Sequence, residues 1–311
     1  MSTILVTGGN GFIGAHLVDA LDALGKHKIT VLDVFPRPFG NIPRGINYIQ
    51  GDLANGNFVR NLLKNEAIDI VYHLAWSTIH ETALQNPAAD VESNLIPSIN
   101  LLDASASSGV RHFIYLSSGG TVYGNPEKTP VPESAPLNPI NAYGITKLTV
   151  EHYVRMFSYL RGLPFTIFRP SVPYGPYQNP HRRQGAVSVF IYRALRNQPV
   201  IIWGDGKATR DYFYIEDLTR ALLSALSVPD ATNQTINLGG KISYSLNELV
   251  TSIENVLGLK IQIRYEASRQ FDVPHLQLDI SAAERILSWQ PKTTLLRGIE
   301  KTAEWIRTIK E

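Results

Sequence analysis

The sequence predicts an α/β protein built on a doubly wound parallel sheet, followed by a smaller α+β part. Three observations favour this fold class. Short β-branched runs alternate with helical patterns, a glycine-rich turn joins the first such run to the first helical pattern, and a later run is apolar almost throughout. The length of 311 residues suits one large α/β domain or two domains that share a cleft.

The strands and helices of the first half follow from residue patterns. Ile4-Leu5-Val6 predicts the first strand, and apolar residues at helical spacing from Ile13 to Leu24 predict the first helix. Gly25 stands where the C-cap of that helix is expected. Further strands are expected over 29–32, 46–49, 69–75, 112–116 and 164–169.

The character of the sequence changes after Arg169, where prolines and a glycine crowd the segment 170–180. We therefore expect a boundary there, between a first domain over 1–170 and a second domain over 171–311. Some segments of the second part are expected to return to the large sheet. Its strands are expected at 200–203, 235–238 and 261–265, and its helices near 184–197, 215–228 and 245–257.

The composition excludes several classes of protein. Lys and Arg number 29 against 27 Asp and Glu, and a net charge of +2 argues against nucleic acid as the main partner. The chain has no cysteine, which removes disulfides and thiolate sites, and no metal site is expected. No apolar run reaches the ~18 residues of a membrane span, and no basic region precedes the short apolar N-terminal run, so a cytoplasmic location is expected.

A glycine-rich segment, Gly8-Gly9-Asn10-Gly11-Phe12-Ile13-Gly14, follows the first strand and opens the first helix. Its glycines permit a tight turn and a close approach to a pyrophosphate, and the helix N-terminus offers free N–H groups. Asp33 closes the second strand, where a carboxylate binds ribose hydroxyls and repels a 2′-phosphate. This predicts a Rossmann-type domain that prefers NAD to NADP, although Arg37 lies near enough to weaken the preference. The expected cofactor contacts here are Gly8, Gly11, Phe12, Ile13, Gly14 and Asp33.

Asp52 follows Gln50-Gly51 at the expected end of another strand. Two interpretations of this carboxylate remain open. It could hold the amino group of an adenine, or it could cap the next helix.

Tyr143 and Lys147 are four residues apart in a predicted helix, so the phenol and the ammonium share one face. A lysine together with a positive nicotinamide ring would lower the pKa of the phenol from its usual ~10, which suits a general base. Lys147 can also hold the nicotinamide ribose. The same helix carries a second apolar stripe that indicates burial in a subunit interface: Ile145, Leu148, Met156 and Tyr159.

With these motifs in place, the sequence resembles the extended short-chain dehydrogenase/reductase family, and within it the nucleotide-sugar epimerases and dehydratases. The resemblance runs through 7–14, Asp33, 51–53, 73–75, Asn94, 116–124, Tyr143, Lys147, 169–170, 203–206, 210–212, 272–274 and 289–291. It implies that Tyr143 is the base and Lys147 its partner, and that Arg210 and Arg269 grip the diphosphate of a sugar nucleotide. It also places further residues at the cofactor: Asp52, Leu53, Leu74, Ala75 and Asn94. It implies that Thr121 contacts the substrate, that residues 1–170 form the NAD-binding domain and that residues 171–311 form the nucleotide-sugar-binding domain.

One position departs from the family. The catalytic Ser or Thr lies four residues before the Tyr of the Val-Tyr-Gly element, and here that position is Gly119. Ser118 or Thr121 could supply the missing hydroxyl, or a water or substrate hydroxyl could bridge to Tyr143. We favour Ser118, because Gly119-Gly120 permits the break in strand regularity that would turn its side chain toward the site.

The residues after Gly119 discriminate between reactions. By the resemblance, 4,6-dehydratases carry an Asp-Glu pair and decarboxylases a Ser-Glu pair where this chain has Gly120 and Thr121. Elimination needs an acid and a base at adjacent carbons, so dehydration is disfavoured. We expect an isomerase, an NAD-dependent 4-epimerase of a UDP- or dTDP-linked sugar that acts as a homodimer. A nucleotide-sugar dehydratase or net oxidoreductase, and a non-catalytic NAD or nucleotide-sugar-binding protein, remain as alternatives.

Overall fold

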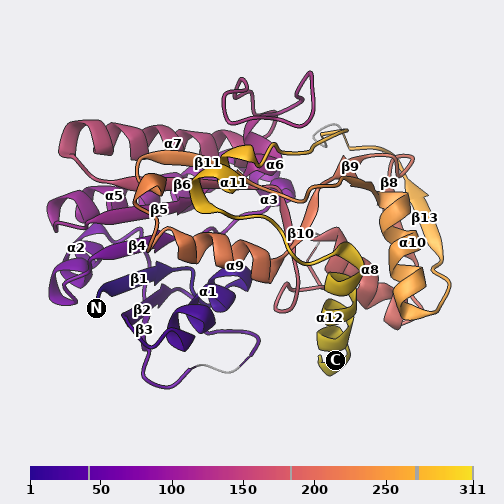
Figure 1. The fold of residues 1–311 in the computed structure, drawn as a ribbon, viewed down its shortest axis with the longest axis horizontal. Helices are drawn as coiled ribbons and strands as arrows, with labels where there is room; N and C mark the ends of the chain where they lie inside the picture. The colour runs from indigo at the N-terminus through magenta and orange to yellow at the C-terminus, as the bar shows by residue number, and fades with distance from the viewer. Residues whose placement is uncertain (41–42, 183, 270–272, 310–311) are drawn as a thin grey trace.

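The computed structural model of the chain describes residues 1–40, 43–182, 184–269 and 273–309. A central sheet of seven parallel strands has the order β11-β6-β5-β4-β1-β2-β3 (Figure 1). The strands are β1 (Thr3–Thr7), β2 (Lys28–Asp33), β3 (Asn47–Gln50), β4 (Ile70–His73), β5 (His112–Leu116), β6 (Phe165–Pro170) and β11 (Gln234–Leu238). The predicted doubly wound parallel sheet is confirmed.

Helices cover both faces of this sheet. The helices α2 (Gly56–Asn65), α5 (Ile96–Ser107) and α7 (Ala142–Arg161) pack side by side on one face, and α1 (Phe12–Ala23) and α9 (Ile215–Ser224) pack together on the other. Because side chains alternate along a strand, Ile4 and Val6 of β1 enter the core beneath α1, while Leu5 enters the core beneath α2 and α5. A sheet buried on both faces explains why its strands are apolar runs.

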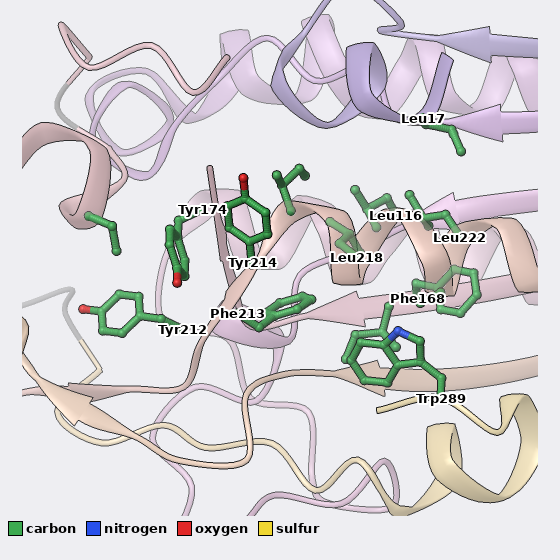
Figure 2. Packing of buried hydrophobic residues seen from close by; sticks show 14 of the residues in the cluster. Leu17, Leu116, Phe168, Tyr174, Tyr212, Phe213, Tyr214, Leu218, Leu222 and Trp289 are labelled. Atoms are coloured by element: carbon green, nitrogen blue, oxygen red, sulfur yellow. The ribbon is translucent and has the colours of Figure 1, made fainter. Parts of the chain in front are cut away.

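The C-terminal part is built from short two-stranded sheets and helices. The strand pairs are β7 (Val172–Tyr174) with β10 (Tyr212–Tyr214), β8 (Val200–Trp203) with β13 (Ile263–Glu266), and β9 (Thr209–Arg210) with β12 (Tyr244–Ser245). The helices α8 (Ala186–Leu195), α10 (Leu246–Leu257) and α12 (Leu295–Thr308) pack on one another. Figure 2 shows how Tyr174, Phe213 and Tyr214 continue the core of the large sheet into this part.

Two segments beyond residue 170 belong to the layers of the first half. β11 pairs with β6 as the outermost strand of the large sheet, and α9 packs against α1. A division at residue 170 therefore separates the chain in sequence, but β11 and α9 from the second part pack with the first part in space. The remaining short helices are α3 (His80–Gln85), α4 (Pro87–Asp90), the π-helix η1 (Val91–Leu95), α6 (Gly119–Val122), the 3-10 helix η2 (Pro229–Ala231) and α11 (Ser281–Leu287). In the part of the chain that the structure describes, no helix has the length and apolarity to cross a membrane.

Candidate active site

A continuous cleft with a volume of about 1820 Å³ follows the carboxyl ends of the central strands and reaches the loops of the C-terminal part. The glycine turn and Asp33 line one end, Tyr143 lies along its wall, and Arg210 and Arg269 line the other end. The connections from β1 to β2 and from β4 to β5 run in opposite directions along the sheet, so the adjacent strands β1 and β4 flank a topological switch point. Open α/β sheets bind ligands at such a switch point.

The glycine turn leaves no room for side chains. Gly8 has a φ of +71°, and a Cβ on it would lie 2.6 Å from the Ala75 nitrogen. A Cβ on Gly14 would lie 2.1 Å from the Gly8 oxygen. Helix α1 starts at Phe12, and its N-cap Gly11 provides no side-chain cap, so its first N–H groups are available to an anion in the cleft.

Asp33 presents its carboxylate at the end of β2. One oxygen accepts the Asn10 N–H at 3.0 Å and the other accepts the Phe35 N–H at 3.2 Å, which leaves acceptor capacity for hydroxyl groups. Arg37, the residue expected to weaken the NAD preference, is buried and donates both terminal nitrogens to Asp19 at 2.8 and 2.6 Å. Its charge is therefore already paired, and Asp33 dominates this end of the cleft.

Asp52 does not cap the helix that follows it. The N-cap of α2 is Asn55, whose side chain accepts the Phe58 N–H at 3.1 Å. Asp52 instead accepts the Ala54 N–H at 2.9 Å within its own turn and lines the cleft beside Leu53. The interpretation of Asp52 as a helix cap is wrong. Two more expected cofactor residues, Leu74 and Ala75, also line the cleft.

The first two turns of α7 bring the predicted catalytic residues together. Asn141 caps the helix by accepting the Gly144 N–H at 2.8 Å. One turn further on, the buried Lys147 ammonium donates to the Leu116 carbonyl at 2.9 Å and lies 3.7 Å from the centre of the Trp76 ring. Ser118 and Tyr143 both line the cleft here, and a hydrogen-bonding interaction with the Ser118 side chain acts to lower the pKa of the phenol.

Burial dominates the protonation of this pair. It raises the pKa of Tyr143, with repulsion from Asp90 acting in the same direction and the bond to Ser118 acting against it. Burial also lowers the pKa of Lys147 to about 7, against the attraction of Asp90 and Glu151. The protein groups alone do not lower the pKa of Tyr143, because the cost of burying a phenolate outweighs their stabilisation. The lowered pKa expected from Lys147 together with a positive nicotinamide ring stays a prediction.

The segment after β5 shows why a glycine occupies position 119. A Cβ on Gly119 would lie 2.5 Å from Leu278 Cδ1 and 2.8 Å from the Arg169 carbonyl oxygen, so packing excludes a side chain there. Ser118 lies between the end of β5 and the start of α6, outside the alternation of the strand, and its side chain turns toward Tyr143. Thr121 is buried and donates to the Ser118 carbonyl at 3.3 Å.

Behind these residues lies a buried ion pair that sequence reasoning missed. Arg169 donates Nε and Nη2 to Glu151 at 2.9 and 2.6 Å, and both side chains are 1% exposed. Glu151 also accepts the Ser117 hydroxyl at 2.5 Å, and Arg169 also donates to the Tyr123 hydroxyl at 2.8 Å. The spacing of Glu151, one turn after Lys147 on the same helix, was the available signal for this network.

Asn94 lies in the cleft wall within the π-helix η1, with its side-chain amide bonded inside the protein. Its oxygen accepts the Ser77 N–H at 2.8 Å, and its nitrogen donates to Asp90 at 3.0 Å. Asn94 therefore fixes the loop after β4. Asp90 was also missed from the sequence, although it precedes Asn94 by one helical turn.

The far end of the cleft is basic. Arg210 on β9 donates to the Thr209 carbonyl at 2.8 Å, and the Arg269 guanidinium lies 4.2 Å from the centre of the Trp203 ring. Both arginines line the cleft, as expected for residues that bind a diphosphate. Asp272, in the 272–274 motif, lies outside the described residues.

Comparison with known proteins shows which protein family the chain belongs to. Residues 4–239 match the sequence profile of the NAD dependent epimerase/dehydratase family. The chain is 33% identical over 304 residues to a putative UDP-glucose 4-epimerase of Methanocaldococcus jannaschii, and the alignment covers 98% of each protein.

Solved structures agree with this match. A UDP-glucose 4-epimerase of Thermotoga maritima, solved with UDP-glucose, superposes with a TM-score of 0.93 at 34% identity over 98% of each chain. A UDP-glucuronic acid 4-epimerase of Bacillus cereus, in complex with UDP-glucuronic acid and NAD, superposes with a TM-score of 0.90 at 30% identity over 98% of this chain and 99% of that one. The two structures differ in the sugar that each holds.

Proposed function

The chain belongs to the NAD-dependent epimerase/dehydratase family, and on this premise we propose that it is an isomerase that epimerises a UDP-linked sugar at C4. The observation that supports this most strongly is the composition of the cleft. A hydroxyl, a phenol and an ammonium, from Ser118, Tyr143 and Lys147, lie along one wall between a dinucleotide-type glycine turn and two arginines.

The residues at the first end of the cleft fit NAD. The turn at Gly8 and Gly14 is closed to any Cβ, so that the backbone can approach a pyrophosphate, and the uncapped start of α1 faces it. Asp33 retains acceptor capacity for ribose hydroxyls, and Arg37 is already paired with Asp19, which makes it a poor partner for a 2′-phosphate. NAD is therefore the cofactor, and we predict that NADP binds at least tenfold more weakly in calorimetry. When bound, NAD accepts a hydride from the sugar carbon and returns it.

The chain's own groups handle the proton. Tyr143 would take it from the C4 hydroxyl, and the Ser118 hydroxyl, which interacts with the phenol, would share it. The Lys147 ammonium would favour the phenolate and bind the nicotinamide ribose through an N–H not used by the Leu116 carbonyl. After the 4-keto sugar has rotated in the cleft to present its opposite face, the proton would return from Tyr143 to the C4 oxygen.

The opposite end would bind the nucleotide. Arg210 and Arg269 suit a diphosphate, because a guanidinium pairs with phosphate oxygens in a bidentate manner. Gly120 and Thr121 carry no carboxylate where a dehydratase would need one, which supports epimerisation. The relatives are named for UDP-linked sugars, which supports UDP in preference to dTDP, and they differ among themselves in the sugar, so the sugar stays open.

We also propose a homodimer formed by the outer face of α7. Ile145, Met156 and Tyr159 are 52%, 40% and 89% exposed on that face, an apolar stripe that a single chain leaves uncovered. Sedimentation of a Met156→Glu, Tyr159→Glu variant tests this, with a monomer as the expected result and an unchanged mass as the contradiction. We also propose a cytoplasmic location, because a chain without cysteine suits a reducing compartment.

A panel of UDP-sugars, offered without added cofactor, tests the proposed activity. The expected result is a C4 epimer of one sugar at constant absorbance at 340 nm, because the cofactor ends each cycle as it began. A net change in absorbance would indicate an oxidoreductase, and a stable keto sugar would indicate a dehydratase. Tight binding without turnover would indicate a non-catalytic protein.

A further inference from the structure

Asp90, the last residue of α4, is a fully buried carboxylate whose hydrogen-bond partners are all neutral. One oxygen accepts the Thr146 hydroxyl at 2.5 Å, and the other accepts the Thr78 hydroxyl and, at 3.0 Å, the Asn94 amide. Within the described ranges, no basic group lies within 4.0 Å of it. A buried charge of this kind is costly unless another charge compensates it.

Lys147 is the matching case of opposite sign. Its buried ammonium donates to a neutral carbonyl, that of Leu116, and lies over the face of Trp76, with no carboxylate within 4.0 Å among the residues that the structure describes. The nearby carboxylate of Glu151 accepts two hydrogen bonds from one edge of the Arg169 guanidinium, through Nε and Nη2, so most of its charge is compensated. Of the two carboxylates that attract the Lys147 ammonium, Asp90 is thus the one whose charge no basic group compensates.

Among the residues that the structure describes, the other groups around Lys147 carry no charge that could replace Asp90. The titratable groups that face it are Tyr143 and Glu151 on α7, Tyr115 on β5, His73 on β4 and Asp90 on α4. Burial lowers the pKa of His73 to about 3 and raises the pKa of Tyr115 and Tyr143, so with the protein groups alone these three are neutral. Both Asp90 and Glu151 raise the pKa of Lys147 by electrostatic attraction, and the effect of Asp90 is the larger of the two.

We propose that Asp90 is the counter-ion of Lys147, held out of direct contact by Thr146, Thr78 and Asn94. In an interior of low effective dielectric constant, two opposite charges stabilise each other across several ångströms. Separation keeps the ammonium charged without using its N–H donors in a salt bridge, so they remain available to ligands in the cleft. Asp90 is therefore a positioning residue that acts through Lys147. Its consequence for turnover rests on the proposed function.

A double-mutant cycle tests the pairing without substrate. Asp90→Asn, Lys147→Met and the double variant are unfolded in urea. We expect the midpoint of the double variant to lie closer to wild type than the sum of the two single shifts, because each single change leaves one buried charge alone. Additive shifts would overturn the proposal. If Asp90→Asn alone does not fold, a folded double variant supports the pairing and an unfolded one contradicts it.

A titration of Lys147 gives a second readout that a merely structural role would not move. In protein labelled with ¹³C at lysine Cε, the Lys147 signal is identified by its loss in Lys147→Met. We expect its midpoint to fall by about one pH unit in Asp90→Asn. The matched control is Glu92→Gln, which removes an exposed carboxylate from the adjacent helix η1 and should leave the midpoint in place. An unmoved midpoint in Asp90→Asn refutes the proposal.

The pH profile of the holoenzyme connects this pair to turnover. A lower pKa of Lys147 means that its charge is lost at lower pH, so the alkaline limb of kcat should move down by the same pH unit. Above both midpoints, turnover should then be about tenfold lower than in wild type. An unmoved limb contradicts the role of Asp90 in turnover. A protein without epimerase activity fails the sugar panel instead and leaves the unfolding and titration results intact.

Discussion

Replacing Glu151 by Gln should destabilise the protein far more than the small change in shape suggests. The carboxylate accepts two bonds from Arg169, at 2.6 and 2.9 Å, and one from Ser117 at 2.5 Å, and both members of the ion pair are 1% exposed. The amide would leave the guanidinium buried without a counter-charge, and breaking such a pair costs about 3–5 kcal/mol. Against a typical total of about 5–15 kcal/mol, this is a large fraction of the stability.

Urea unfolding measures this loss, and the chain offers a matched control. Asp103 and Arg60 form an ion pair at 3.0 Å, but their side chains are 35% and 50% exposed. Water solvates both charges there, so Asp103→Asn should cost only about 0–1 kcal/mol. Equal losses in Glu151→Gln and Asp103→Asn would refute the reasoning, because burial would then have no influence on the value of an ion pair.

Three further substitutions test the proposed catalytic residues on the wall of the cleft and the glycine beside them. Tyr143→Phe should lower kcat by ~10²–10⁴-fold or more while calorimetry still detects NAD binding, because the ring packs as before but no oxygen takes the proton. Ser118→Ala should lower kcat by ~100-fold in the same epimerase assay, since the hydroxyl proposed to share the reacting proton with the phenol is lost. Gly119→Ser should lower the thermal unfolding midpoint, because its Cβ would meet Leu278 and a backbone carbonyl at 2.5 and 2.8 Å.

Each of these has an outcome that contradicts it. Wild-type rates in Tyr143→Phe would remove the phenol from the reaction. Unchanged turnover in Ser118→Ala would assign the bridging hydroxyl to water or to the substrate. A Gly119→Ser variant that is as stable as wild type and more active would show that the site accepts a hydroxyl at that position.

The features that the sequence predicted best are those that local patterns determine. The strands of the large sheet and the turn from Gly8 to Gly14 follow from apolar runs and from glycine spacing, which need no knowledge of distant residues. The one-turn spacing of Tyr143 and Lys147 also follows from helix geometry alone. The break after β5 that turns Ser118 toward Tyr143 agrees with the glycine pair at 119 and 120.

The features that the sequence did not predict depend on partners far along the chain. Asp90 bonds Thr146, 56 residues away, and only the fold makes them neighbours. The charge of Arg37 is paired with Asp19 in α1, and the position of Arg37 after β2 in the sequence does not reveal this partner. The raised pKa of Tyr143 reflects burial, a tertiary quantity, whereas its spacing from Lys147 suggested the opposite direction.

The most direct test of the central claim is the fate of hydrogen at C4 of the sugar. A UDP-sugar deuterated at C4, identified as a substrate in the panel, is converted in ordinary water and both epimers are examined by NMR and mass spectrometry. Transient oxidation and return of the hydride to the same carbon predicts that deuterium stays at C4 in both epimers. Loss of the label to water, or a product reduced or oxidised relative to the substrate, would contradict the account.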